Sequence, residues 1–351
     1  MNRNIVFTAK DTAELVDNPM PEVTPGTVLV KLVRSTISSG TERANLVGTP
    51  QAGISILAKP GDDRVLWPRQ LGYSSSGIVV DVGEGVTQFT KGDRVALVQG
   101  KHSEYCRMPV ENVFKLPDNV SFEDAALAYI SSFPMAALRK CRLEMGESAI
   151  VMGQGILGQL AVLLLRAAGA VPVVAADPVA EKRTRALELG ADASFDPSDP
   201  DFAAQVRDYT DRNRKGMLGN LPDAGPQVGI EVTGNGKALD NLLDAIAPFG
   251  RIALLGCTRD SNFQIDYYHK VHGRGVTLVG AHGAARPVRE SAPGWWTSRD
   301  DVCTFLNLLS HGRISLRGFV SEVRKPEECP VVYARLATGG SFPVVQFDWK
   351  E

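Results

Sequence analysis

Three glycines follow a short apolar run near the middle of the chain, at Gly153, Gly155 and Gly158. The run before them is typical of a buried strand, and the apolar segment after them is typical of a helix. Glycine at the first position permits a tight turn, at the second it leaves the backbone open to a phosphate, and at the third it lets the helix pack closely. The N–H groups of a helix N-terminus attract anions. The spacing therefore predicts a pyrophosphate-binding turn.

Asp177 ends the next apolar run, about 20 residues after Gly158. A carboxylate at this distance accepts hydrogen bonds from the ribose hydroxyls of an adenosine and repels a 2′-phosphate. Lys182 follows within the next helical segment, and Arg183 and Arg185 lie beside it. The sequence favours NAD as the cofactor, and NADP stays open as the less favoured alternative because these arginines are near.

Alternating strands and helices must position this turn. From residue 148 to residue 280, apolar runs of strand length alternate with helical segments; the later strands are expected at 193–195, 228–232, 251–255 and 276–280. This order predicts a doubly wound parallel sheet with helices on both faces. Residues 1–118 instead contain short apolar runs between turn signals, which favours a partly closed antiparallel barrel. The irregular segment 44–68 is expected to be a loop or short helix in a lid-like position.

Composition excludes several classes of protein. The chain has 351 residues with 44% hydrophobic and 22% charged side chains, which is ordinary for a soluble globular protein. The net charge of −2 and the lack of a basic block argue against a nucleic-acid partner. No apolar stretch is long enough for a membrane span, and the first residues do not form a signal segment. The five widely spaced cysteines favour reduced thiols, so we expect a cytoplasmic protein.

A series of motifs in fixed order resembles the medium-chain dehydrogenase/reductase superfamily, in its alcohol-dehydrogenase-like group. Besides the glycine turn and Val232-Thr233-Gly234, these motifs are Leu71-Gly72, Gly77-Ile78-Val79, Lys91-Gly92-Asp93-Arg94-Val95, Leu116-Pro117-Asp118, Glu188-Leu189-Gly190-Ala191 and Phe249-Gly250-Arg251-Ile252. The resemblance implies an α/β protein with a GroES-like β-barrel domain at 1–122 and 286–351 and a Rossmann domain at 123–285. It also implies a small-molecule substrate and a homodimer or homotetramer, with 276–280 as the strand that pairs across the dimer.

The resemblance extends the cofactor site beyond the turn and the acid. The full set of predicted cofactor-binding residues is Gly153, Gly155, Ile156, Leu157, Gly158, Asp177, Lys182, Thr233, Gly256, Cys257 and Gly280.

The positions that hold catalytic zinc in the family are different in this chain. Zinc-dependent members have Cys-x-Thr-Asp where this chain has Ser39-Gly40-Thr41-Glu42, and Gly-His-Glu where it has Gly72-Tyr73-Ser74. The third ligand is expected within 129–132, which reads Tyr-Ile-Ser-Ser, and the four-cysteine structural loop is missing. Serine and tyrosine are poor zinc donors. We therefore expect no metal, with rescue by Glu42 and His102 as the less favoured alternative.

Without zinc, a side chain must accept the alcohol proton or polarise the carbonyl in the reverse reaction. The predicted catalytic candidates are Thr41, Tyr73, Glu42, His102 and His282. Thr41 matches the family's proton-relay hydroxyl, and Tyr73 would enter the space of the missing metal. Glu42 is a base or a partner of Arg43, His102 a base or an ordinary surface histidine, and the resemblance places His282 near the nicotinamide.

Few residues of the sequence indicate which substrate is bound. Trp295 and Trp296 lie in an irregular insert at 286–299, where their faces suit a sugar ring or simply pack the insert or a dimer contact. The sequence predicts a zinc-independent oxidoreductase that transfers a hydride between NAD(H) and a polar secondary alcohol or ketone, such as a sugar, polyol or cyclitol. The alternatives are an NADPH-dependent, zinc-free quinone or enoyl reductase and a non-catalytic nucleotide-binding protein.

Overall fold

A computed structural model describes residues 1–49, 52, 67–211, 224–259 and 262–350. Most of the expected lid-like segment 44–68 lies outside these residues. None of the helices among them combines the length and apolar character needed to cross a bilayer. Contacts divide the chain into unit 1, residues 1–130 with 302–351, and unit 2, residues 131–301. The chain passes between the units within two helices, α3 (Ala128–Lys140) and α8 (Ser298–Ser310).

The boundaries differ from the sequence-based division at two places. Residues 123–130 were expected in the Rossmann domain and belong to unit 1, and residues 286–301 were expected in the barrel domain and belong to unit 2. Arg286 donates to the carbonyl oxygen of Ser132 at 3.1 Å, and Arg139 forms an ion pair with Asp301 at 2.8 Å.

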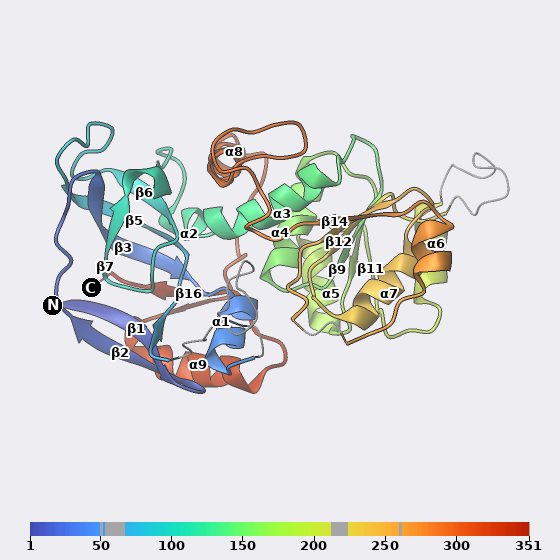
Figure 1. The fold of residues 1–351 in the computed structure, drawn as a ribbon, viewed down its shortest axis with the longest axis horizontal. Coiled ribbons are helices and arrows are strands. Elements are labelled where there is room, and N and C mark those ends of the chain that lie inside the picture. Colours follow the sequence, from blue (N-terminus) through green and yellow to red (C-terminus); the bar gives the residue numbers. More distant parts are fainter. Residues whose placement is uncertain (50–51, 53–66, 212–223, 260–261, 351) are drawn as a thin grey trace. The chain divides into compact units, whose positions relative to one another are not determined.

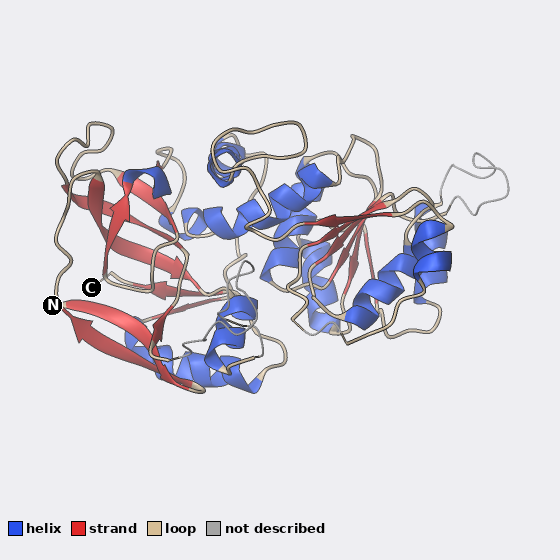
Figure 2. Ribbon diagram, viewed as in Figure 1, coloured by secondary structure: helices blue, strands red, loops and turns tan. Residues whose placement is uncertain are grey.

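Unit 1 is built around a mixed sheet whose strands run in the order β15-β16-β3-β5-β6-β8, with β7 also paired to β3 (Figures 1 and 2). β15 and β16 pair in parallel, and the other pairs are antiparallel. A second sheet has the order β2-β1-β4. This confirms the expected GroES-like barrel. The strands are β1 (Asn2–Ala9), β2 (Thr12–Asn18), β3 (Thr27–Thr36), β4 (Arg69–Gln70), β5 (Ser74–Val82), β6 (Arg94–Val98), β7 (Tyr105–Pro109), β8 (Val113–Lys115), β15 (Glu322–Arg324) and β16 (Val345–Asp348).

Besides its parts of α3 and α8, the described portion of unit 1 contains short helices. They are α1 (Ser39–Leu46), α2 (Phe122–Ala125) and α9 (Cys329–Thr338), with 3-10 turns at Val110–Asn112 and Pro326–Glu328. Ser121 caps α2 by accepting the N–H of Asp124 at 3.0 Å. The core of this unit collects large side chains from distant parts of the sequence, including Phe7, Tyr333 and Trp349.

Unit 2 contains a six-stranded parallel sheet in the order β11-β10-β9-β12-β13-β14. The strands are β9 (Ala149–Met152), β10 (Val173–Ala176), β11 (Ala193–Phe195), β12 (Val228–Glu231), β13 (Arg251–Leu254) and β14 (Thr277–Gly280). Figure 2 shows helices on both sides of these strands. The central strands are buried along their whole length, as a sheet covered on both faces requires. The predicted Rossmann fold is confirmed.

The helices of unit 2 are α4 (Ile156–Ala167), α5 (Ala180–Glu188), α6 (Phe202–Thr210) and α7 (Gly236–Ala245), with a π-helical turn at Tyr268–His272. The strand order reverses between β9 and β12, because β10 and β11 lie on one side of β9 and β12 to β14 lie on the other. Ligands of doubly wound sheets bind at the carboxyl ends of the strands at such a reversal. The glycine turn follows β9 directly, so it lies at this point.

Candidate active site

The glycine turn of unit 2 gives each of its three glycines a steric role. Gly153 has φ of +98°, and a β-carbon there would lie 2.6 Å from Cγ2 of Thr233. A β-carbon on Gly158 would collide with the carbonyl oxygen of Gly153. Gly155 is the N-cap of α4, and a β-carbon there would meet nothing within 4 Å. The first and third glycines thus shape the turn, and the second leaves open space at the helix N-terminus.

Asp177 is buried beside this turn and is tied to it by hydrogen bonds. Its Oδ2 accepts the N–H of Gln154 at 2.8 Å, and its Oδ1 accepts the N–H of Val179 at 2.9 Å. The ammonium of Lys182 lies 3.9 Å from Oδ2. An ionised carboxylate has about four lone-pair sites, so Asp177 can accept further hydrogen bonds from a ligand. The residue therefore both fixes the glycine turn and faces the adjoining cavity.

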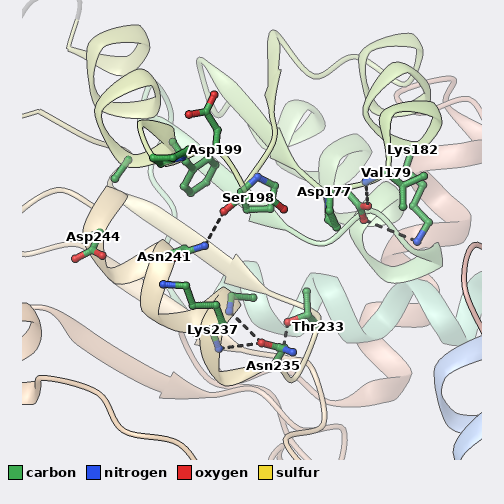
Figure 3. A pocket seen from close by; sticks show the side chains of 16 residues that line it. Asp177, Val179, Lys182, Ser198, Asp199, Thr233, Asn235, Lys237, Asn241 and Asp244 are labelled. Carbon is green, nitrogen blue, oxygen red and sulfur yellow. Dashed lines mark hydrogen bonds and ion pairs between the residues drawn. The ribbon is translucent and has the colours of Figure 1, made fainter.

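A cavity of about 820 Å³ opens beside Asp177 (Figure 3). It is lined by residues that follow β10 and β12, together with α7 and the loop before α6. Polar groups on its wall include Lys182, Ser198, Asn235 and Asn241; Asn241 donates to the carbonyl oxygen of Pro197 at 2.8 Å. Asn235 caps α7 through the N–H groups of Lys237 and Ala238. The volume and the polar wall suit the adenosine half of a dinucleotide.

Glu231 is a buried acid that the sequence analysis missed. It ends β12, and its Oε1 accepts the N–H of Thr233 at 2.7 Å and also the hydroxyl of that residue. Its Oε2 accepts the N–H of Gly234 at 3.1 Å. Burial raises the pKa of Glu231, against these hydrogen bonds. The carboxyl group shapes the turn that carries Thr233, and an acid at the end of an apolar strand was its signal in the sequence.

The remaining cofactor candidates lie at strand ends or at the start of α4. Ile156 is buried and Leu157 half-buried in the first turn of α4. Gly256 follows β13, and a β-carbon there would collide with the N–H of Gly234. Cys257 and Gly280 are exposed.

His282 is exposed just beyond β14, and its Nδ1 accepts the N–H of Ala284 at 3.1 Å. Partial desolvation lowers its pKa, and the charges of Lys140 and Arg259 lower it further. The imidazole is therefore neutral at neutral pH, with the Nε2 nitrogen as its N–H donor.

In unit 1, Tyr73 lies among hydroxyl groups. Its phenol is hydrogen-bonded to the hydroxyl of Ser38 and to the side chain of Thr41. The Tyr129 ring meets it edge-on, with 5.5 Å between ring centroids, and Gln99 donates to the Tyr129 phenol at 2.6 Å. Burial raises the pKa of Tyr73, so the phenol is neutral near neutral pH. It can donate a hydrogen bond or pass a proton along the hydroxyl chain, but it is not a phenolate base.

Glu42 and His102 meet in the interior of unit 1. The His102 Nε2 lies 3.2 Å from both carboxylate oxygens, and Glu42 is 0% and His102 1% exposed. Glu42 also accepts the N–H of Ser38 at 2.8 Å and the Tyr333 hydroxyl at 2.6 Å. The His102 ring contacts the Ser35 hydroxyl at 2.8 Å through Nδ1. Neither side chain reaches the surface, whereas sequence reasoning expected His102 there.

The donors at the family's metal positions do not fit a zinc ion. Tyr73 is hydrogen-bonded to Ser38, which precedes the first of these positions, and Glu42 and His102 are held in the buried network. Zinc sites use thiolate, imidazole or carboxylate donors in tetrahedral geometry. Within the described part of the chain, no group of three His, Cys, Asp or Glu side chains could hold a metal ion.

The two tryptophans of the insert contact cations of α3. The Trp296 ring lies 3.4 Å from the guanidinium carbon of Arg139, and the Trp295 ring lies 4.9 Å from the Lys140 ammonium. Cations on aromatic faces stabilise such contacts. Both rings therefore help to pack the insert, which was one of the two roles expected for them.

Comparisons with known proteins agree with this architecture. Residues 24–118 match the family described as "Alcohol dehydrogenase GroES-like domain", and residues 157–294 match "Zinc-binding dehydrogenase". The L-threonine 3-dehydrogenase of Pyrococcus furiosus is 28% identical over 300 residues, covering 77% of this chain and 80% of that protein. The sorbitol dehydrogenase of Mus musculus is 28% identical over 287 residues, covering 73% and 74%.

A solved structure, the 2R,3R-butanediol dehydrogenase of Bacillus subtilis, covers 99% of both chains with a TM-score of 0.78 and 23% identity, which shows likeness of fold. The two family matches together cover more than half of the chain and follow the order of its two units. The chain belongs to the alcohol-dehydrogenase-like medium-chain dehydrogenase/reductase superfamily, and it is an oxidoreductase.

Proposed function

We propose that this protein is a zinc-independent, NAD-linked dehydrogenase of polar secondary alcohols, such as polyols or sugars. The observation that carries the proposal is the hydroxyl group of Tyr73 at a family metal position, bonded to Ser38 and Thr41. The relatives named for sorbitol and threonine oxidise substrates with several polar groups, which supports this substrate class.

Unit 2 supplies the cofactor site in this proposal. The open N-terminus of α4 at Gly155 would receive the pyrophosphate, and Asp177 would accept hydrogen bonds from the adenosine ribose. Arg183 supports NAD over NADP, because its guanidinium is already bonded to the carbonyl oxygen of Asp177 at 2.8 Å and to the carboxylate of Asp196 at 3.1 Å. NAD held by the glycine turn and Asp177 would supply the acceptor for the hydride of the alcohol.

Unit 1 handles the proton in this proposal. Oxidation of an alcohol releases one hydride to the cofactor and one proton from the hydroxyl group. The substrate hydroxyl donates to the Tyr73 oxygen while the Tyr73 proton moves to Ser38 or Thr41, and Thr41 is partly exposed so that the proton can pass to water. In the reverse direction, the neutral phenol donates to the carbonyl oxygen and polarises it.

Glu42 and His102 act as positioning residues in this mechanism. The Glu42 carboxylate accepts the Ser38 N–H, which orients the residue that bonds Tyr73. His102 and Tyr333 contact the same carboxyl group, so its position is fixed from two further sides.

The experiment that tests the proposal is a survey of NAD reduction across polyols, sugars and simple secondary alcohols, run with protein whose metal content is measured. We expect turnover with at least one polyol, equal rates after chelation, and weaker activity with NADP. A rate that falls by orders of magnitude on chelation and returns with Zn²⁺ would overturn the zinc-independent assignment. Tighter binding of NADPH together with reduction of C=C bonds would support the reductase alternative.

A further inference from the structure

Lys140 is the last residue of α3, and it is buried with only 6% of its surface exposed. Its ammonium donates to the carbonyl oxygen of Gly280 at 3.1 Å and to that of Ala285, and it faces the Trp295 ring at 4.9 Å. The two carbonyl oxygens and the aromatic ring thus provide one partner for each of the three N–H groups of the ammonium.

The two carbonyls bracket one short segment of unit 2. Gly280 ends β14, and Ala285 lies just beyond His282. Among parallel strands of this topology, the carboxyl ends carry the ligand contacts. Lys140 thus fastens both ends of residues 281–284 to α3. Phe133, from the same helix, supports the middle, because a β-carbon on Gly283 would lie 3.0 Å from its ring.

The charges around Lys140 explain why it bonds carbonyl groups. The Asp301 carboxylate pairs with Arg139 at 2.8 Å and with Arg286 at 3.7 Å. His282 is the other titratable neighbour, and the charge of Lys140 lowers its pKa. Burial first, and then the charge of Arg286, lower the pKa of Lys140 to about 8, against the attraction of Asp301.

A buried ammonium is costly unless it is well bonded, and an apolar side chain would fill this position without that cost. The geometry supplies the compensation, because the cation holds two backbone carbonyls at an edge of the sheet where ligands bind. We propose that Lys140 is a positioning residue for the cofactor, which holds residues 281–285 in the conformation that the dinucleotide contacts. This inference rests on the proposed function of unit 2 as a cofactor site.

The test compares Lys140→Met and Lys140→Arg with the wild-type protein by hydrogen exchange and by titration with NADH. Met fills the same space but cannot donate, whereas the guanidinium of Arg can bond both carbonyls. We expect Lys140→Met to raise amide exchange in 281–286 about tenfold and to weaken NADH binding by a similar factor, as the loss of charge-assisted hydrogen bonds predicts. Lys140→Arg should restore most of both.

A matched control is Lys325→Met in unit 1, where the ammonium also bonds a carbonyl oxygen, that of Lys350 at 2.6 Å. This variant should leave both measurements unchanged. Unchanged exchange in 281–286 of Lys140→Met would overturn the inference, and so would a uniform rise across unit 2 with no rescue by arginine. Failure of the proposed function is distinguishable, because the wild-type protein would then not bind NADH while the exchange comparison would still report on Lys140.

Discussion

The cofactor turn of unit 2 and the hydroxyl cluster of unit 1 are built by different means. Around Gly153, Gly155 and Gly158 the groups that meet a ligand are backbone N–H groups, and the shape depends on missing side chains. Around Tyr73, the chemistry depends on side-chain hydroxyls that strand and helix positions bring together. An extra atom should therefore disable the turn, whereas a missing atom should disable the hydroxyl cluster.

The largest effect is expected when atoms are added to the turn. Gly158→Val should abolish NADH binding and destabilise unit 2, because its β-carbon would collide with the Gly153 carbonyl. Gly155→Ala is the matched variant: it meets nothing within 4 Å, so it should fold normally and lose only affinity. Fluorescence titration with NADH and thermal unfolding measure both. Equal loss of stability in the two variants would remove the steric distinction between the glycines.

A smaller effect is expected when one oxygen is removed from the hydroxyl cluster. Tyr73→Phe keeps the ring and its contact with Tyr129 but loses the hydroxyl group. The turnover number should fall about 100-fold, the range of a lost general acid–base group, with little change in NADH affinity. Steady-state kinetics and cofactor titration separate the two quantities. Wild-type turnover in this variant would exclude Tyr73 from the proton path.

Asp177 belongs to both kinds of site, because it acts through its side chain and that side chain supports the backbone of the glycine turn. Asp177→Asn keeps an acceptor for the Gln154 N–H but removes the negative charge. We expect about a tenfold loss of preference for NAD over NADP, the size of one lost charge-assisted ribose contact. The ratio of the kcat/KM values for NAD and NADP measures it. An unchanged ratio would show that cofactor choice is made elsewhere.

The last effect is on stability rather than on cofactor binding or turnover, and it concerns Lys140, whose pKa is about 8 in the folded protein and 10.5 ordinarily. Between these values the unfolded chain binds a proton that the folded chain has lost. The free energy of unfolding should therefore rise with pH in this window, by up to about 1.4 kcal/mol per pH unit. Below pH 8 Lys140 is protonated in both the folded and the unfolded chain, so it adds no pH dependence there. Urea denaturation of the wild type and Lys140→Met from about pH 7 to about pH 10 isolates the slope, since other groups titrate in both. Identical slopes would contradict it.

The difference between the two regions also explains what could be predicted from the sequence. Glycine spacing and apolar runs report local backbone geometry, so β9, the turn and α4 were located closely, and β11 was predicted at its observed bounds. The bounds of other elements depend on tertiary contacts. The strands expected at 228–232 and 251–255 each end one residue earlier, at Glu231 and Leu254.

The surroundings of Tyr73 and His102 were harder to predict, because they come from segments far apart in the chain. Helix α9 was missed, and it carries Tyr333, which bonds Glu42. Trp349 donates to the Ser35 hydroxyl at 2.8 Å, and Ser35 in turn contacts His102. A partner about 300 residues away leaves no periodic signal near the residue itself. For this reason the burial of His102 could not be predicted from the sequence.

This buried network also bears on the order in which the protein folds during synthesis. Ser35 and Glu42 leave the ribosome early, but their partners Trp349 and Tyr333 are made after the whole of unit 2. Domains generally fold as units, and contacts between residues far apart in the chain slow folding. Unit 2 is a continuous segment, so it can complete its sheet first. The barrel must wait with its core incomplete, because Tyr333 and Trp349 belong to that core, and the nascent chain is expected to depend most on chaperones during that interval.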